Sequence, residues 1–183
     1  WGGLLKSRKS AALPGAKIYP PTLTNSDLAN IKIAKEMGVT GVMQPFVRDH
    51  SDLECVKEAL REAGAEDIRL FAKIENMDGV RKLEKLLPAA DEIVIARGDL
   101  GNAVHLWDLP GVQRQISEKC RAAGKPFMVV TQMLASMERS PVPTRAEVND
   151  IFHAVMDGAA SIMVTGETAV GDYPVEVLSL IHI

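Results

Sequence analysis

The sequence predicts a parallel α/β fold of the (β/α)8 barrel type, with about five βα units present. Short, almost continuously apolar runs alternate with stretches of helical periodicity, as expected for parallel strands covered on both faces. The runs end at intervals of roughly 22 to 35 residues, which is the length of a βα unit. A closed eightfold barrel usually takes about 250 residues. The chain has 183 residues, so these units would form part of such a barrel.

Each predicted element follows from local pattern. The predicted strands span residues 40–46, 68–74, 92–96, 127–131 and 161–164. The predicted helices span residues 26–37, 52–63, 78–87, 111–123 and 146–157. Thr24 and Thr144 each stand three residues before an acid, which is the capping-box arrangement at a helix start. Four glycines follow helical stretches, where a left-handed residue closes the last turn: Gly38, Gly64, Gly124 and Gly158.

Composition excludes several classes of protein. A formal net charge of −3 and 4% aromatic residues argue against a nucleic-acid groove, which needs basic and stacking side chains. No apolar run reaches the roughly 18–20 residues of a membrane-spanning helix. Cys55 and Cys120 are too few for a disulfide framework, so we expect a reducing, cytoplasmic setting. The chain begins at Trp1, without signal-peptide features, and we expect the natural protein to begin elsewhere.

Polar residues at the strand ends are the first candidates for chemistry, because parallel α/β folds bind ligands there. Lys73 and Glu75 lie two residues apart at the end of a strand and therefore share one face. Burying both is costly unless they pair or hold a ligand. The spacing alone leaves open a plain ion pair and a ligand site.

The next strand end carries Asp99 between Gly98 and Gly101. Glycines let the backbone approach a ligand closely. Asp99 and Glu75, on neighbouring strand ends, would offer two hard oxygen ligands of the kind that Mg²⁺ or Mn²⁺ prefers. The integrin-type tripeptide at residues 97–99 is not expected to act in adhesion, because it follows a buried strand.

Thr131 ends the fourth run and offers a hydroxyl either to a ligand or to a local turn. Residues 165–168 end the fifth run with a Gly and hydroxyls that could meet an anion or open a helix. The sequence contains neither a P-loop nor a dinucleotide-binding fingerprint. Phosphate handling would therefore depend on Lys73, a metal ion and backbone amides.

Four segments, in this order, resemble the pyruvate kinase family: residues 73–76 (KIEN), 96–101 (ARGDLG), 131–134 (TQML) and 165–169 (TGETA). Linking segments agree, among them residues 5–10, 46–48, 124–126 and 143–147. The similarity runs from Trp1 to about Glu176.

The resemblance implies a (β/α)8 barrel with a lid domain inserted after its third strand. Residues 1–15 would return from that lid, and residues 16–183 would form part of the catalytic barrel. It also implies a glycolytic phosphotransferase that moves the phosphoryl group of phosphoenolpyruvate to ADP, giving pyruvate and ATP. The implied cofactors are Mg²⁺ or Mn²⁺, with K⁺ whose ligands would lie outside this chain. The implied setting is a cytoplasmic homo-oligomer.

The resemblance also implies roles for single residues. Lys73 would stabilise the transferring phosphoryl group, and Glu75 and Asp99 would hold the divalent metal. The backbone amides of Gly98 and Asp99 would hold the substrate carboxylate, and the Thr131 hydroxyl would contact it near the point of enolate protonation. Pro45 stands where the family often has Ser, so a hydroxyl near the phosphate would be lost.

Two other functions stay open at this point. One is a metal-dependent aldolase or lyase that handles a pyruvate enolate on the same carboxylate pair, without needing Lys73. The other is a non-catalytic binding module. Because five βα units leave two sheet edges unpaired, we expect the chain alone to be inactive and either poorly soluble or oligomeric.

Overall fold

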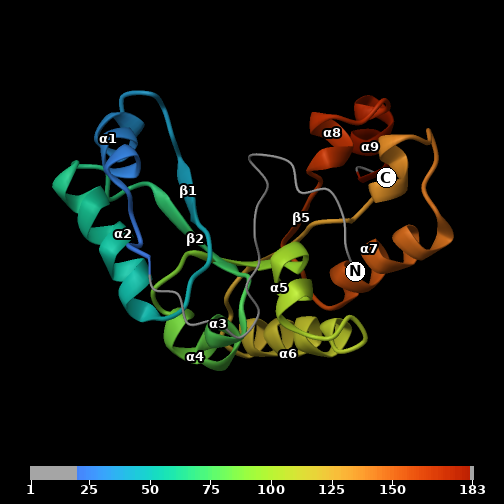
Figure 1. Cartoon of the computed structure of the whole chain (residues 1–183), viewed down its shortest axis with the longest axis horizontal. Helices are drawn as coiled ribbons and strands as arrows, with labels where there is room; N and C mark the ends of the chain where they lie inside the picture. Colours follow the sequence, from blue (N-terminus) through green and yellow to red (C-terminus); the bar gives the residue numbers. More distant parts are fainter. Residues whose placement is uncertain (1–19, 182–183) are drawn as a thin grey trace, which may run out of the picture.

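The computed structural model describes residues 20–181 and confirms the predicted parallel α/β fold (Figure 1). These residues form one five-stranded sheet in the order β1-β2-β3-β4-β5, and every neighbouring pair is parallel. The strands are β1 (Gly41–Gln44), β2 (Arg69–Ile74), β3 (Glu92–Ala96), β4 (Phe127–Val130) and β5 (Ser161–Met163). Each predicted strand is present.

Helices connect each strand to the next along the same side of the sheet (Figure 1). The helices are α1 (Asn25–Ala34), α2 (His50–Glu62), α3 (Met77–Arg81), α4 (Leu83–Leu86), α5 (Arg97–Ala103), α6 (Leu109–Ala122), α7 (Arg145–Met156), α8 (Gly166–Ala169) and α9 (Pro174–Ile181), with a 3-10 turn η1 at Ala135–Glu138. The predicted return segment at residues 1–15 lies outside the described residues.

Alternation along the strands separates two apolar clusters. Leu70, Ala72 and Ile74 of β2 belong to the large core beneath the helices. Phe71 contacts the smaller cluster on the opposite face, formed around Val94, Ala96 and Val130. Continuing the same alternation, Lys73 and Glu75 follow Phe71 on the face that the helices do not cover.

The predicted helix boundaries are largely confirmed. Thr24 and Thr144 both form capping boxes, with Asp27 and Glu147 as their partners. The four glycines predicted to close helices all have positive φ: Gly38 73°, Gly64 64°, Gly124 61° and Gly158 91°. A further capping box, between Asp49 and Asp52 at the start of α2, was not predicted.

One predicted helix is divided, and one further helix lies outside the ranges that periodicity predicted. The single helix expected over residues 78–87 is two helices, α3 and α4, which meet at Lys82. Its apolar spacing continues across the break, with Val80, Leu83 and Leu86 all buried, so periodicity could not reveal the interruption. Residues 97–103 follow β3 directly and form α5, with the side chain of Leu100 fully buried beneath it.

Both cysteines are free, as the composition predicts. Burial raises the pKa of the Cys120 thiol to about 12, so this group stays protonated and unreactive near neutral pH. Within residues 20–181, no helix has the length and apolar character needed to cross a bilayer.

Asp52 ties the start of α2 to two separate segments. Its carboxylate accepts hydrogen bonds from the Thr22 hydroxyl at 2.6 Å and from the Arg48 backbone amide at 2.8 Å. The Arg48 guanidinium also lies 2.6 Å away. Burial alone would raise the pKa of Asp52, but the hydrogen bonds from Arg48 and Thr22 outweigh it and lower the pKa from 3.8 to about 2.

We expect Asp52→Asn to lower the free energy of unfolding by about 2–3 kcal/mol at pH 7, because hydrogen bonds to a charged acceptor are lost. A depressed pKa stabilises the fold fully above the unfolded value of 3.8, and this contribution disappears as the pH falls through about 2. The difference between wild type and variant should therefore narrow from pH 4 to pH 2. Urea unfolding across this pH range measures it.

Asp67→Asn is the matched control for that experiment. Asp67 pairs with Lys35 at 3.0 Å, but its side chain is 68% exposed, so its loss should change stability by under about 1 kcal/mol. Equal effects of the two substitutions at pH 7 would contradict the importance of the Asp52 network.

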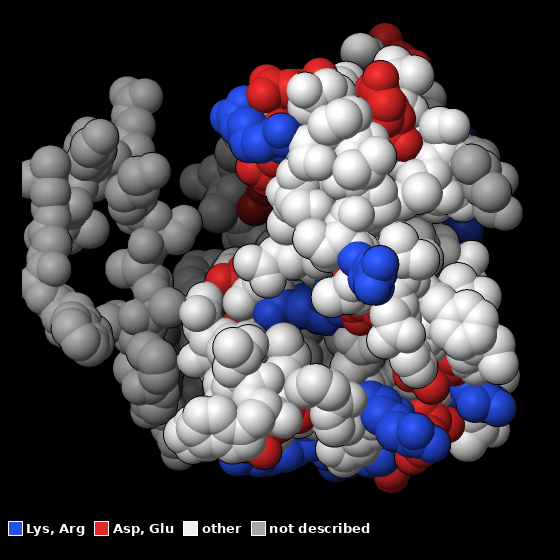
Figure 2. Space-filling view, turned by 90° about the vertical axis from the view of Figure 1, so that its right-hand side faces the viewer, with Lys and Arg blue, Asp and Glu red and all other residues white. Residues whose placement is uncertain are grey.

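Apolar side chains gather on the side of the molecule that carries α7, α8 and α9, which Figure 2 shows as mostly uncharged. The outer surface of α7 exposes Val148, Phe152, Val155 and Met156 at helical spacing. Among the described strands, β1 and β5 each have a single neighbour. Exposed apolar faces and unpaired strand edges both favour association between copies.

We therefore expect the chain to self-associate at micromolar concentration, and Phe152→Glu to shift it toward smaller species. Sedimentation velocity from about 1 to 100 µM measures this, with the exposed Glu118→Gln as a control that leaves the apolar face unchanged. A wild-type chain that sediments as a monomer at every concentration would show the expectation to be wrong.

Candidate active site

Lys73 and Glu75 meet at the carboxyl end of β2. The Lys73 Nζ lies 2.9 Å from Glu75 Oε1. The Glu75 side chain is 2% exposed, whereas that of Lys73 is 28% exposed. The prediction that the two share a face is confirmed. The ion pair also forms, and the Lys73 side chain stays partly exposed.

The second oxygen of Glu75 is held by the backbone. Phe46, just after β1, donates its amide to Glu75 Oε2 at 2.8 Å. Phe46 has a φ of 51°, and the following amide, that of Val47, donates to the Lys73 carbonyl at 3.3 Å. The Asn76 side chain donates to the Val47 carbonyl at 3.1 Å. The loop after β1 thus fixes the carboxylate orientation in advance, although the strained Phe46 had no sequence signal.

Gly98 and Asp99 lie in the first turn of α5, directly after β3. The sheet register pairs Ile74 with Ile95, so Glu75 and Ala96 follow at the same level of adjacent strands. Asp99 is exposed and lies three residues after Ala96, the last residue of β3. The structure therefore places both predicted metal-binding carboxylates at the carboxyl ends of the neighbouring strands β2 and β3.

Thr131 follows β4 with a φ of 81°, and Gln132 has a φ of 55°. We call residues 131–133 the β4 turn. Regular alternation from Val129 would send the Thr131 side chain toward the helix-covered core. Instead it packs on α5. A Cβ added to Gly98 would lie 3.0 Å from Thr131 Cγ2, which shows this contact. The predicted Thr131 and Gly98 are thus in contact, and Gly98 is the residue that leaves room for Thr131.

Two charged residues beside the strand ends, Arg97 and Glu167, were not predicted to have a role. Arg97 donates from Nε and Nη2 to the Thr131 carbonyl at 3.1 and 2.8 Å. Glu167 accepts the amides of Leu134 at 3.1 Å and Thr165 at 2.7 Å. Burial would raise the pKa of Glu167, but these backbone hydrogen bonds lower it overall. A charged residue adjoining a buried strand is the signal that could have identified Arg97.

Residues 165–168, which could have met an anion or opened a helix, open the short helix α8. Glu167 is buried there at 2% exposure and links α8 to the segment after β4. The expectation that this segment opens a helix is therefore confirmed, and Glu167 links that helix to Leu134.

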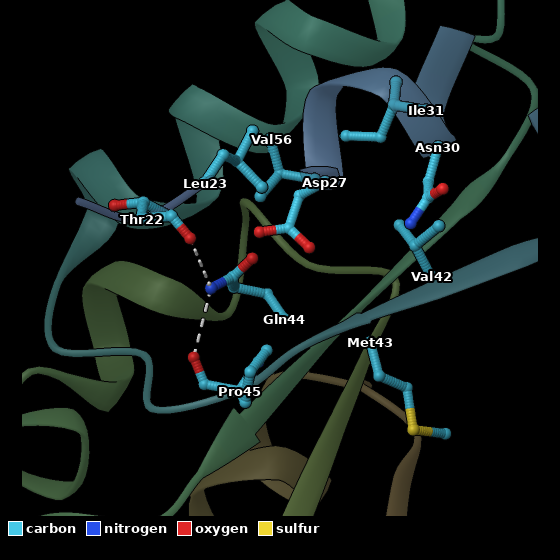
Figure 3. A pocket seen from close by; sticks show the side chains of 10 residues that line it. All are labelled: Thr22, Leu23, Asp27, Asn30, Ile31, Val42, Met43, Gln44, Pro45 and Val56. Carbon is cyan, nitrogen blue, oxygen red and sulfur yellow. Dashed lines mark hydrogen bonds between the residues drawn. The ribbon is translucent and has the colours of Figure 1, made fainter. Parts of the chain in front are cut away.

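Two cavities are lined by other residues than Lys73, Glu75, Asp99 and Thr131. A cavity of about 310 Å³ lies at the edge of the sheet beside β1, α1 and α2 (Figure 3). Figure 3 shows Asp27 among its lining side chains, with Gln44 hydrogen-bonded to Thr22 and Pro45. Its lining carries a carboxylate without Lys or Arg, so it suits an anionic phosphate poorly.

A second cavity, of about 320 Å³, lies at the opposite end of β2 from Lys73 and is lined by Lys57, Arg61 and Asp91 among others. Its two cations already pair with Glu54, Glu58 and Glu66. Neither cavity therefore competes with the strand ends as the place for chemistry.

The donor set at the strand ends is compatible with a small hard cation. No cluster of three or more His, Cys, Asp or Glu within residues 20–181 could enclose a metal ion on its own. Mg²⁺ does not require one, because it is usually bound by one or two carboxylates together with water and substrate oxygens. Glu75 and Asp99 can supply two such carboxylates.

Comparison with known proteins gives one family. Residues 1–178 match the family described as "Pyruvate kinase, barrel domain". The chain is 42% identical to a pyruvate kinase of Bacillus licheniformis over 180 residues, covering 98% of the chain and 31% of that protein. Over 181 residues it is 42% identical to the human "Pyruvate kinase PKLR", covering 99% and 31%. Over 176 residues it is 42% identical to a Dictyostelium discoideum pyruvate kinase, covering 96% and 34%.

The chain thus spans about a third of the length of the curated relatives it matches. The match nevertheless takes in almost every residue of the chain and all the strand-end segments described above. The chain belongs to the pyruvate kinase family.

Proposed function

We propose that this chain forms part of the catalytic barrel of a pyruvate kinase, which transfers the phosphoryl group of phosphoenolpyruvate to ADP in glycolysis. The observation that carries the proposal is Lys73 at the carboxyl end of β2, whose ammonium lies 2.9 Å from a buried carboxylate and whose side chain is 28% exposed. Family membership favours this reaction over an enolate aldolase or lyase and over a non-catalytic module.

Lys73 would act on the charge of the transferring group. In this reaction the enol oxygen–phosphorus bond breaks and a bond to a terminal oxygen of ADP forms. Catalysis of phosphoryl transfer is mainly positioning and neutralisation of the equatorial oxygens. The ion pair with Glu75 restricts the ammonium before substrate arrives, which is the preorganisation that electrostatic catalysis needs.

Glu75 and Asp99 would hold Mg²⁺ or Mn²⁺ together with substrate oxygens. When bound, such an ion supplies Lewis-acid neutralisation of the phosphoryl and enolate oxygens. Glu75 enters this role already oriented, because the Phe46 amide and Lys73 engage its two oxygens. K⁺ would be needed as well, with ligands outside this chain.

The other end of the substrate would lie toward α5. The backbone amides of Gly98 and Asp99 would bind the carboxylate of phosphoenolpyruvate, and the Thr131 hydroxyl would contact it from the β4 turn. Their adjacency supports this arrangement, since Thr131 packs directly on Gly98. The enolate formed after transfer takes up a proton at its methylene carbon, which would occur near Thr131. The product pyruvate and ATP then leave a cytoplasmic, homo-oligomeric enzyme.

The direct test uses a chimera in which this chain replaces the matching segment of the Bacillus licheniformis enzyme. We expect phosphoenolpyruvate-dependent formation of ATP from ADP. Cleavage of a pyruvate-derived carbon–carbon bond without ATP formation would favour the lyase, and metal binding without turnover would favour the non-catalytic module.

Lys73→Met in the chimera should lower kcat by roughly 10³-fold or more, by analogy with other groups that neutralise charge in phosphoryl transfer. Lys82→Met is its matched control, because the Lys82 side chain is 45% exposed and pairs with Asp49 at 3.3 Å at the surface, away from the site. Coupled measurement of pyruvate formation compares the two. Near-normal turnover of Lys73→Met would overturn the role assigned to Lys73.

Glu75→Gln should weaken binding of Mn²⁺ to the chimera by about tenfold or more, since a carboxylate ligand becomes a neutral amide. The paramagnetic resonance signal of free Mn²⁺ reports this without any turnover. Glu84→Gln, at a 76% exposed side chain paired with Lys119, is the control. Unchanged Mn²⁺ affinity in Glu75→Gln would remove Glu75 from the metal site.

A further inference from the structure

Arg97 lies where three elements meet. It is the first residue of α5, and its side chain, 12% exposed, reaches the β4 turn and α7. Its Nε and Nη2 donate to the Thr131 carbonyl at 3.1 and 2.8 Å. Nη2 also lies 3.2 Å from the Gln132 carbonyl and 3.0 Å from Met133 Sδ. One guanidinium thus contacts all three residues of the β4 turn.

The backbone that Arg97 contacts is strained. Thr131 and Gln132 both have positive φ, at 81° and 55°. This conformation is rare for residues other than glycine, and for a β-branched residue such as Thr it is an outlier. Strained backbone persists only where its surroundings over-determine it. The planar guanidinium, donating to two successive carbonyls, supplies that constraint.

Asp150 on α7 fixes the guanidinium from the other side. Its Oδ2 accepts from Arg97 Nη1 at 2.6 Å. An arginine has five N–H donors, and these contacts use the Nε donor, both Nη2 donors and one of the two on Nη1. The charge is balanced by Asp150 and most donors are committed to the protein. Arg97 is therefore placed to act through the β4 turn and not on a ligand.

We infer that Arg97, oriented by Asp150, is a positioning residue that holds the β4 turn so that the Thr131 side chain lies against Gly98 at the site. This inference rests on the proposed function for its catalytic consequence. The geometric part stands on the contacts alone. A lysine at position 97 keeps the charge but cannot donate along two directions of a rigid plane at once.

The test compares Arg97→Lys, Arg97→Met and Asp150→Asn in the chimera with the Bacillus licheniformis enzyme. We expect Arg97→Lys and Arg97→Met to lower kcat by about 100-fold or more, the size of effect seen when a reacting group is slightly misplaced. The KM for ADP should stay within about threefold, because only the Thr131 side of the site is disturbed. Asp150→Asn should lower kcat by a smaller factor, about tenfold.

Two readouts separate positioning from a general loss of structure. Exchange of the pyruvate methyl protons with deuterated solvent should fall in parallel with kcat, because it depends on the Thr131 side. Amide hydrogen exchange should accelerate at residues 131–134 and stay unchanged in β2 and β3. Arg114→Lys, in an exposed ion pair with Glu118, is the matched control and should alter neither.

Wild-type kcat in Arg97→Lys, or unchanged amide exchange at residues 131–134 in both Arg97 variants, would overturn the inference. If Arg97→Met fails to fold, Arg97→Lys decides, because it keeps a cation beside Asp150. If the unsubstituted chimera forms no ATP, the proposed function fails separately. Faster amide exchange at residues 131–134 would then still support the positioning role, and unchanged exchange would refute it.

Discussion

The parallel register of the sheet is the constraint on which the rest of the structure depends. All four strand pairings run in one direction, so the ends of β2, β3 and β4 lie at one edge although they are far apart in sequence. A polar residue just after any of these strands reaches that edge without further folding. If β4 alone ran antiparallel to β3, Thr131 would lie at the opposite edge from Glu75. The chemistry of the site therefore follows from topology before it follows from any single side chain.

At that edge, irregular backbone is stabilised by charged side chains. Phe46, Thr131 and Gln132 are the described non-glycine residues with positive φ, and all three lie within two residues of a strand end. Each such residue costs on the order of 1–3 kcal/mol. Glu75 accepts the Phe46 amide, and Arg97 donates to the Thr131 and Gln132 carbonyls. Hydrogen bonds to charged groups contribute about 1.5–3 kcal/mol, which is comparable with this cost.

The sequence predicted the strands and most helix boundaries. Of the site, it predicted the location but not the backbone conformation. Strands could be predicted because burial on both faces leaves continuous apolar runs, and helix ends because capping boxes and glycines are local signals. The common face of Lys73 and Glu75 also followed from strand periodicity, whereas their ion pair was one of two possibilities left open. The conformation of Thr131 did not, because its positive φ is imposed by Arg97 and by space at Gly98, both distant in sequence. The break between α3 and α4 at Lys82 was not predicted, because the apolar spacing continues across it.

The distribution of exposure among the charged groups distinguishes those that shape the site from those that can meet a ligand. Glu75 and Glu167 are each 2–4% exposed, and backbone amides occupy their carboxylates. Arg97 is 12% exposed and balanced by Asp150. Lys73 is 28% exposed, and Asp99 is exposed at the next strand end. Because buried charges are retained only when paired, the first group fixes backbone and orientation. In the proposed reaction Glu75 would serve both purposes, because the protein orients it and it would also hold the metal together with the exposed Asp99, while Lys73 would meet the anionic substrate.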